Sequence, residues 1–145
     1  MTVDVATEIE IERPRAEVAA FASDPDNATR WYRNIEAAAW ETAPPLAVGS
    51  RFRFRARFLG RTLEYTYEVV EHEPDERLVM AMTSGPFVME TSYGWSETER
   101  GTLMTLRNRG EPEGYLRVVG GVVAAAMRRA NRADLARLKR LLEST

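Results

Sequence analysis

The amino-acid sequence predicts one α+β domain in which a curved antiparallel sheet of seven strands wraps a long C-terminal helix. Two observations predict this architecture. Segments of alternating apolar and polar residues follow one another along most of the chain and are joined by short turns, which is typical of an antiparallel sheet. Over residues 115–143 the apolar period changes to that of a helix. Because the apolar face of such a sheet needs a cover, we expect this helix to lie against it.

Length and composition limit the classes of function. With 145 residues, 44% of them hydrophobic and 29% charged, the chain is expected to form a single globular domain over residues 1–145. The formal net charge of −2 argues against a general nucleic-acid binder, which usually carries a strongly basic face. The chain has no cysteine, which excludes disulfides, thiol chemistry and cysteine-based zinc sites.

The sequence shows no segment that would direct the chain to a membrane. The N-terminus lacks the basic and apolar regions of a secretory signal. The longest apolar stretch, residues 118–127, is too short to span a bilayer. We therefore expect a soluble cytoplasmic protein.

The N-terminal third begins with a strand and two short helices. The first strand covers residues 3–12 and ends before Pro14. Pro14 is expected at the first position of a helix that ends at residue 21, because proline suits the first helical turn. Asp24, followed by a proline, is expected to cap a second short helix that ends near residue 33.

Two alternating segments, residues 51–58 and 61–69, predict a hairpin that turns at Leu59 and Gly60. One register satisfies both faces of this hairpin together, which is what determines strand pairing. On the apolar face it pairs Phe54 with Tyr65, Phe52 with Tyr67, and Ala56 with Leu63. On the other face it brings Arg55 to Glu64 and Arg51 to Glu68.

Turn residues separate four further strands from one another. These strands are expected over residues 35–42, 77–82, 87–97 and 102–109. Residues 110–114 are expected to form a loop before the helix, and Gly120 and Gly121 are expected to weaken the helix or to divide it into two pieces. The inward stripe of the helix comprises Leu116, Val119, Val123, Met127, Leu135, Leu138 and Leu142.

The predicted inner face of the sheet is rich in aromatic residues and methionine, which is the typical lining of a ligand cavity. Its members are Phe52, Phe54, Tyr65, Tyr67, Met80, Met82, Phe87, Met89, Tyr93 and Trp95. Trp31, Leu106, Asn108, Val119, Val123 and Met127 complete the predicted lining. One helix is too small to cover this face, and its small residues Gly120, Gly121 and Ala124 to Ala126 leave room. The alternative is a plain packed core.

The polar side chains of this face are candidates for contacts with a ligand. Tyr65, Tyr67 and Tyr93 each combine an apolar ring with a hydroxyl donor. Asn108 shares the inward parity of its strand, so it is expected either to contact a ligand or to be exposed at the strand end.

No convincing catalytic centre is visible in the sequence. The single histidine, His72, lies just before a turn and is expected to face solvent, which argues against a catalytic triad. No cluster with the spacing of metal ligands and no phosphate-binding glycine motif is present, so neither a metal nor a cofactor is expected. Most acidic residues, Glu90 among them, have the outward parity of their strands.

Basic residues gather at two places. On the hairpin, Arg51, Arg53, Arg55 and Arg57 are best explained as a solvated sheet face, although an acidic lipid or a nucleic acid is the alternative. The helix end carries Arg128, Arg129, Arg132, Arg137, Lys139 and Arg140, which complement the helix dipole. Such a patch is compatible with at most a transient contact with an anionic membrane.

Several short motifs in this order and spacing resemble the polyketide cyclase/dehydrase-like (SRPBCC) branch of the START-related helix-grip superfamily. They are residues 11–14 leading to Val18 and Phe21, Asp24 and Pro25, Trp31, residues 48–50, residues 69–74, Gly101 and Thr102, and residues 134–143. The resemblance runs over nearly the whole chain. It implies a helix-grip fold with a deep cavity between sheet and helix.

The resemblance further implies a small hydrophobic ligand, such as a lipid, a quinone or a polyketide-like molecule. Because members of the superfamily share no universal catalytic residues, none is assigned here. Two alternatives to a binder or carrier stay open. One is a cyclase or dehydratase that acts on a ligand in the same cavity, and the other is an interaction module that uses the outer sheet face. The chain is expected to be a monomer or a homodimer.

Overall fold

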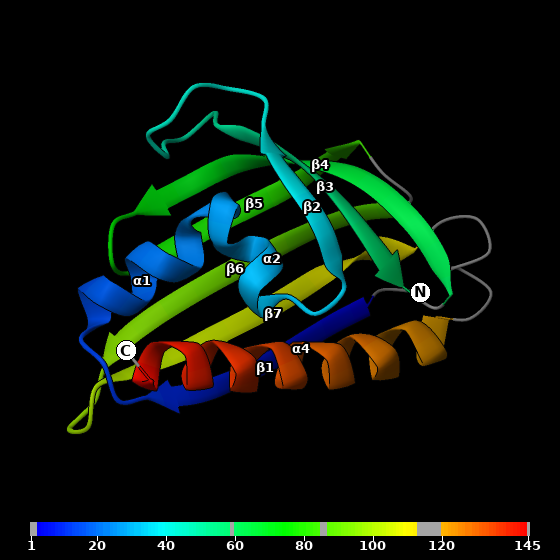
Figure 1. Ribbon diagram of the computed structural model, residues 1–145. Coiled ribbons are helices and arrows are strands. Elements are labelled where there is room, and N and C mark those ends of the chain that lie inside the picture. The colour runs from blue at the N-terminus through cyan, green and yellow to red at the C-terminus, as the bar shows by residue number, and fades with distance from the viewer. Residues whose placement is uncertain (1–2, 59, 85–86, 113–119, 145) are drawn as a thin grey trace.

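The computed structural model describes residues 3–58, 60–84, 87–112 and 120–144 (Figure 1). The elements follow in the order β1 (Val3–Ile11), α1 (Arg15–Ser23), the 3-10 helix η1 (Pro25–Asn27), α2 (Ala28–Trp31), β2 (Ile35–Trp40), β3 (Arg51–Phe58), β4 (Arg61–Glu73), β5 (Arg77–Ser84), β6 (Phe87–Glu97), β7 (Thr102–Pro112) and α4 (Gly120–Glu143). The predicted α+β architecture is confirmed, with seven strands, short helices after the first strand and a long C-terminal helix.

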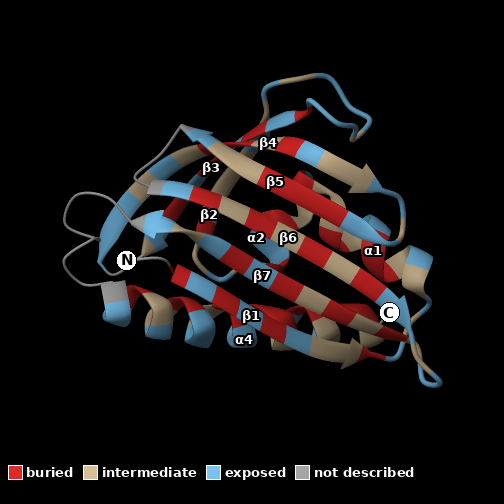
Figure 2. Ribbon diagram, turned by 180° about the vertical axis from the view of Figure 1, so that it is seen from behind, coloured by how far each residue is buried: buried red, intermediate tan, exposed pale blue. Residues whose placement is uncertain are grey.

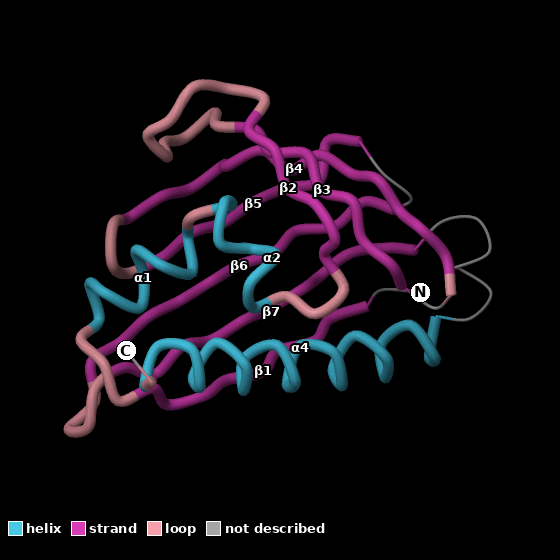
Figure 3. The backbone as a smooth tube through the Cα atoms, viewed as in Figure 1, coloured by secondary structure: helices cyan, strands magenta, loops and turns pink. Residues whose placement is uncertain are grey.

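All seven strands form one antiparallel sheet in the order β1-β7-β6-β5-β4-β3-β2. Strands β1 and β2 lie at opposite edges although they are consecutive in the chain, and the short helices connect them. The sheet curls around α4, which runs alongside β1 (Figure 1). The described helices lie on this same side of the sheet (Figure 3). The fold is therefore a helix grip in which one concave face of the sheet is available for a core and a cavity.

The register of the hairpin β3–β4 is the one that the sequence predicts. Phe54 pairs with Tyr65, and Phe52 pairs with Tyr67. The buried residues of β3 alternate with exposed arginines, so one face of the hairpin points inward and the other points to solvent. Because a slip of one residue would exchange these two faces, the apolar pattern determines the pairing.

The short helices differ from the prediction at their ends. Pro14 precedes α1 as its N-cap with a ψ of 145°, so the first helical residue is Arg15. Asp24 is a cap as predicted, and its side chain accepts a hydrogen bond of 2.9 Å from the backbone N–H of Asp26. The second helix ends at Trp31 rather than near residue 33, because Tyr32 already has an extended backbone.

The predicted loop over residues 110–114 is wrong at its start, because β7 continues to Pro112. Gly110 pairs with Met89 of β6 and with Val3 of β1, so partners on both sides extend the strand. A Cβ atom at residue 110 would lie 2.1 Å from the carbonyl oxygen of Val88, so only glycine fits there. Residues 113–119, which include the predicted start of the helix, lie outside the described residues.

The core lies between the concave face of the sheet and the inward stripe of α4. From the helix, the predicted residues Val123, Met127, Leu135, Leu138 and Leu142 are buried, whereas Leu116 and Val119 lie outside the described residues. Seen from behind, the strands show bands of buried and exposed residues along their length, as expected for a sheet with one solvated face (Figure 2). Burying one such leucine contributes about 2 kcal/mol of stabilisation.

Candidate functional site

A cavity lies between the concave face of the sheet, the short helices and α4. Its volume is about 140 Å³, counted as the space open to the centre of a water molecule. One water needs roughly 10–15 Å³ on this measure, so the cavity is much larger than a packing defect. Strands β3 to β7 contribute most of the wall, and α4 contributes Met127, Ala130, Asn131 and Asp134.

Most of the sequence-predicted lining residues are brought together around this cavity. They are Trp31, Phe52, Phe54, Tyr65, Tyr67, Met80, Met82, Met89, Tyr93, Asn108 and Met127. Trp95, Leu106 and Val123 are buried but belong to the core beside the cavity rather than to its wall. The side chain of Phe87 and the whole of Val119 lie outside the described part of the chain.

The aromatic rings of the wall pack against one another with tilted or edge-on geometry. The ring centroids of Phe54 and Tyr65 are 5.7 Å apart, and those of Tyr65 and Tyr67 are 5.5 Å apart. The rings of Trp31 and Tyr93 are 5.9 Å apart. These arrangements are the favourable ones for aromatic pairs, so the contacts help to hold the rings of the wall in place.

A pair of tyrosine hydroxyls joins the short helices to the sheet. The oxygens of Tyr32, at the end of α2, and Tyr93, on β6, are 2.5 Å apart. One of the two O–H groups donates in this hydrogen bond, which leaves the other O–H free to donate elsewhere. Tyr32 was not among the predicted site residues, because a residue at the end of a four-residue helix has no periodicity that would place it.

A second polar group connects strands β4, β6 and β7. The hydroxyl of Thr91 donates to Oδ1 of Asn108 at 2.7 Å, and the hydroxyl of Tyr67 lies 2.8 Å from that of Thr91. Because the Thr91 hydrogen is used toward Asn108, the Tyr67 hydroxyl is the donor toward Thr91, and Sδ of Met89 is a second acceptor 3.1 Å from it. Asn108 is buried, so of its two predicted environments the structure places it in the cavity wall.

The third polar group lies on α4 and was missed by the sequence analysis. Asp134 is 2% exposed, and its Oδ1 accepts a hydrogen bond of 2.9 Å from the backbone N–H of Arg33. Asn131 is buried one turn earlier, and its Nδ2 has no hydrogen-bond partner among the described residues. The available signal was their spacing, because both continue the inward stripe between Met127 and Leu138.

Burial changes the acidity of these groups. It raises the pKa of Asp134 to about 6, although the hydrogen bond from Arg33 and the charges of Arg137 and Arg33 lower it. Burial also raises the pKa values of the tyrosines, that of Tyr67 to about 12. The tyrosines are therefore neutral hydrogen-bond donors at physiological pH, while Asp134 titrates close to it.

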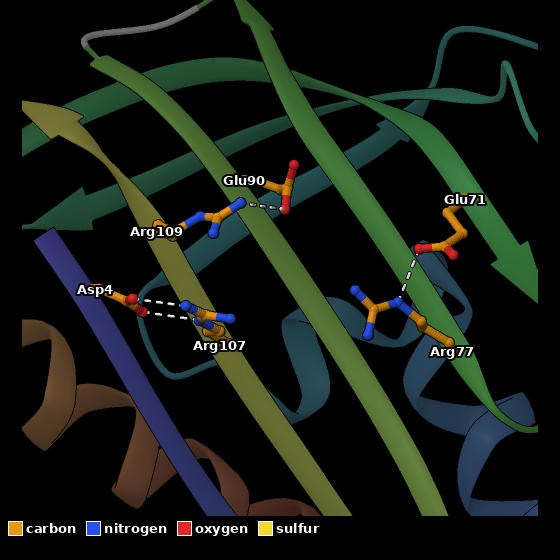
Figure 4. Close-up of polar contacts among 6 residues, drawn as sticks. All are labelled: Asp4, Glu71, Arg77, Glu90, Arg107 and Arg109. Carbon is orange, nitrogen blue, oxygen red and sulfur yellow. Dashed lines mark hydrogen bonds and ion pairs between the residues drawn. The ribbon is translucent and has the colours of Figure 1, made fainter. Parts of the chain in front are cut away.

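The outer sheet face carries ion pairs. Arg107 pairs with Asp4 at 2.6 Å, Arg109 with Glu90 at 3.6 Å, and Arg77 with Glu71 at 2.8 Å (Figure 4). On the hairpin, Arg55 pairs with Glu36 and Arg53 with Glu41. Arg55 is opposite Glu64 and Arg51 is opposite Glu68 in the register, as predicted, but Arg55 forms its ion pair with Glu36 on β2. The exposed arginine stripe is thus partly neutralised by acids.

His72 is the second-last residue of β4, just before the turn as predicted, and its side chain is half-buried rather than fully exposed. It is not part of the cavity wall. In the part of the chain that the structure describes, no three His, Asp or Glu side chains gather in a way that would hold a metal ion. None of the described helices is long and apolar enough to cross a membrane.

Comparison with known proteins places this fold and cavity in a family. A family model described as polyketide cyclase / dehydrase and lipid transport matches residues 2–143. A comparison with curated protein sequences finds no match.

Solved structures share the fold over the full length of the chain. The protein TTHA0849 from Thermus thermophilus has a TM-score of 0.82 at 18% identity, and 100% of both chains is covered. The ZhuI aromatase/cyclase from Streptomyces sp. R1128 has a TM-score of 0.79 at 14% identity, with 99% of this chain and 94% of that chain covered. A START superfamily protein from Mycobacterium smegmatis has a TM-score of 0.72 at 13% identity, with 92% and 99% covered. Identities this low show the common fold alone.

Proposed function

The chain belongs to the polyketide cyclase/dehydrase and lipid transport family, and we propose that it binds or carries a small hydrophobic molecule in the cavity between sheet and α4. The observation that carries this proposal is the cavity itself. Its wall is built mainly from aromatic rings and methionines, and a few hydroxyl, amide, carboxyl and guanidinium groups are placed among them. This combination of an apolar wall with few polar groups is typical of small-molecule sites.

The fold explains why such a cavity persists instead of collapsing. The aromatic residues of β3 and β4 are held by the paired strands, and α4 presents the small side chain of Ala130 toward them. A rigid sheet cannot move inward to fill the space that a small helical residue leaves. The ligand classes expected from the sequence, a lipid, a quinone or a polyketide-like molecule, all fit an apolar wall. The cytoplasmic location stays a prediction.

The proposal is tested by looking for bound ligand and by filling the cavity. Native mass spectrometry of the purified protein, followed by organic extraction, should reveal a small apolar molecule, and naphthalene should bind in a titration. Ala130→Phe places a ring in the cavity and should weaken naphthalene binding at least tenfold. Ala133→Phe is the matched control, because Ala133 is exposed on the same helix three residues later and should leave binding unchanged.

A structure of this protein with a filled interior, no co-purified ligand and no naphthalene binding would contradict the proposal. Equal effects of Ala130→Phe and Ala133→Phe would show that any binding occurs elsewhere.

A second candidate function is a cyclase or dehydratase that acts on a bound polyketide-like molecule. It is favoured by the presence of an ionisable carboxyl, Asp134, in the same wall as the Tyr32–Tyr93 hydroxyl pair. Groups of this kind transfer protons when their pKa lies near the working pH. Incubation with a linear poly-carbonyl thioester should then release water, detected as a loss of mass in the product. Tyr93→Phe should abolish this turnover while leaving substrate binding largely intact.

A further inference from the structure

Asp134 has an incomplete set of hydrogen bonds within the cavity wall. Its Oδ1 accepts from Arg33, whereas no donor among the described residues bonds its Oδ2. The residue is 2% exposed and lines the cavity, so a partner for Oδ2 comes most directly from a molecule in the cavity. A buried carboxylate that accepts few hydrogen bonds is costly, which makes this oxygen a strong acceptor for any donor that enters.

Tyrosine hydroxyls from three elements lie close enough to this carboxyl for its charge to affect their pKa values. The negative charge of Asp134 contributes to raising the pKa values of Tyr32, Tyr65 and Tyr93. The Tyr32–Tyr93 pair has one O–H left over, and no described residue forms a hydrogen bond with the Tyr65 hydroxyl. The polar side of the cavity therefore offers one strong acceptor together with free hydroxyl donors.

Ligand groups differ in how many of these donors and acceptors they can satisfy with hydrogen bonds. A carboxylate or a ketone only accepts hydrogen bonds, so it leaves Oδ2 of Asp134 without a donor. An ammonium only donates, so it leaves the tyrosine O–H groups without an acceptor. A hydroxyl both donates and accepts, and it adds no charge to an apolar cavity.

We propose that the cavity selects neutral apolar molecules that carry a hydroxyl, such as a phenol, an enol or an alcohol, and that this hydroxyl donates to Asp134. This inference rests on the proposed ligand-binding function and adds the chemical class of the ligand. Asn131 lies on the same side of the wall, and its unpartnered amide is a further polar group near the bound hydroxyl.

The charges around Asp134 predict how this selectivity depends on pH. Arg33 follows α2, and Arg137 lies on α4 one turn after Asp134; both favour the ionised carboxyl. Tyr32, Tyr65 and Tyr93 interact with it as neutral groups. Arg57 and Asp24 are the other described charged residues that line the cavity. With a pKa of about 6, Asp134 is ionised at pH 8 and mostly protonated at pH 5. An anionic ligand is therefore repelled at pH 8 and less so at pH 5.

Three probes of nearly the same shape test the inference, namely naphthalene, 2-naphthol and 2-naphthoate. Their dissociation constants are measured by calorimetry or equilibrium dialysis at about pH 8 and about pH 5. At pH 8 we expect 2-naphthol to bind about tenfold more tightly than naphthalene, because hydrogen bonds to charged groups are worth at least this factor. We expect 2-naphthoate to bind about tenfold more tightly at pH 5 than at pH 8, and naphthalene to be insensitive to pH.

Asp134→Asn should remove the preference for 2-naphthol and the pH dependence of 2-naphthoate binding. Asp4→Asn is the matched control on the outer sheet face and should change neither. If Asp134→Asn does not fold, the pH dependence of the unaltered protein decides the question alone.

The outcomes separate this inference from the proposed function. Equal affinities for naphthalene and 2-naphthol, with pH-independent binding of 2-naphthoate, would overturn the hydroxyl selectivity and leave ligand binding standing. Failure of all three probes to bind would overturn both.

Discussion

At the scale of single residues, the buried polar groups of the cavity wall fall into two kinds. Thr91, Tyr67 and Asn108 satisfy one another in a short chain of hydrogen bonds across three strands. Asp134 and Asn131 on α4, and Trp31 at its Nε1, keep atoms without a partner among the described residues. The first kind contributes to stability, because a buried polar group that loses its partner costs about 1–3 kcal/mol. The second kind reduces stability and is the natural place for a ligand.

Replacing Thr91 by valine should separate the two ends of the satisfied chain. Valine has nearly the same shape but no hydroxyl, so Tyr67 keeps only Sδ of Met89 as an acceptor and Oδ1 of Asn108 loses its donor. We expect the free energy of unfolding to fall by about 2 kcal/mol in urea titrations. Thr105→Val is the control on β7, because Thr105 is half-buried and outside the cavity wall, and equal losses for the two variants would contradict the importance of the chain.

Asp134 should make the stability of the protein depend on pH in an unusual direction. Its pKa is about 6 in the folded protein, against an ordinary value of 3.8, so between these values the folded state binds more protons than the unfolded state. The contribution of Asp134 to the free energy of unfolding is therefore highest below about pH 4, where the carboxyl is protonated in both states. It falls as the pH rises to 6 and stays low at higher pH, because the folded protein must then hold a buried charge. The full difference is on the order of 3 kcal/mol, at 1.36 kcal/mol for each pKa unit.

The variant Asp134→Asn removes this titration, so it should gain stability over the unaltered protein as the pH rises from 4 to 6. Thermal or urea unfolding at several pH values measures the difference between the two proteins, in which the contributions of other carboxyls cancel. A difference that is constant between pH 4 and pH 7 would contradict the burial of this carboxyl.

At the scale of elements, the hairpin β3–β4 was predictable from its sequence, whereas the end of strand β7 was not. The hairpin has an apolar face and a charged face, and a single register satisfies both, so its pairing was predictable from the sequence. The end of β7 carries Gly110, Glu111 and Pro112, which read as a loop. Strands β1 and β6 supply backbone partners on both sides, and this tertiary pairing outweighs the weak strand preference of glycine.

The close packing of β6 on β7 predicts a clear difference between two glycines. Gly110→Ala places a Cβ atom 2.1 Å from the carbonyl oxygen of Val88, so the strands must separate. We expect a loss of about 2 kcal/mol or more in the free energy of unfolding. At Gly94, on the same pair of strands, a Cβ atom meets nothing within 4 Å, so Gly94→Ala should be neutral or slightly stabilising. Similar losses for both variants would contradict the local packing described here.

At the scale of the whole molecule, the cavity depends on segments that are distant in the sequence. Residues from α2, from the sheet and from α4 line one space, and it exists only when all of them are in place. A molecule that binds there binds the folded state alone, so it should stabilise the entire fold by mass action.

Ligand-dependent melting measures this coupling. At a 2-naphthol concentration of one hundred times its dissociation constant, the stabilisation is about 2.7 kcal/mol, which corresponds to a rise in melting temperature of roughly 5–10 °C. Ala130→Phe, which is expected to bind at least tenfold more weakly, should show about half of this stabilisation or less, and Ala133→Phe should show it in full. An equal rise in both variants would place the binding site away from the cavity.

The candidate site was only partly predictable. Residues on strands were placed correctly on the inner face because side chains alternate with a period of two, as for Phe52, Tyr67 and Met89. Whether an inward residue reaches the cavity or the core beside it depends on how far along the curved sheet it lies. Trp95 and Leu106 belong to the core for this reason, although their parity is the same as that of the lining residues.

The sequence by itself determined the architecture of this protein, because alternation, turn residues and one long amphipathic helix leave few ways to bury the apolar faces. It also determined that the inner face of the sheet is aromatic. Only the tertiary structure decided which polar groups meet there. Tyr32 and Tyr93 are joined across the space between α2 and β6, and Asp134 on α4 is tied to the backbone of Arg33. Such contacts depend on the curvature of the sheet and on the position of the helix, which no local pattern encodes.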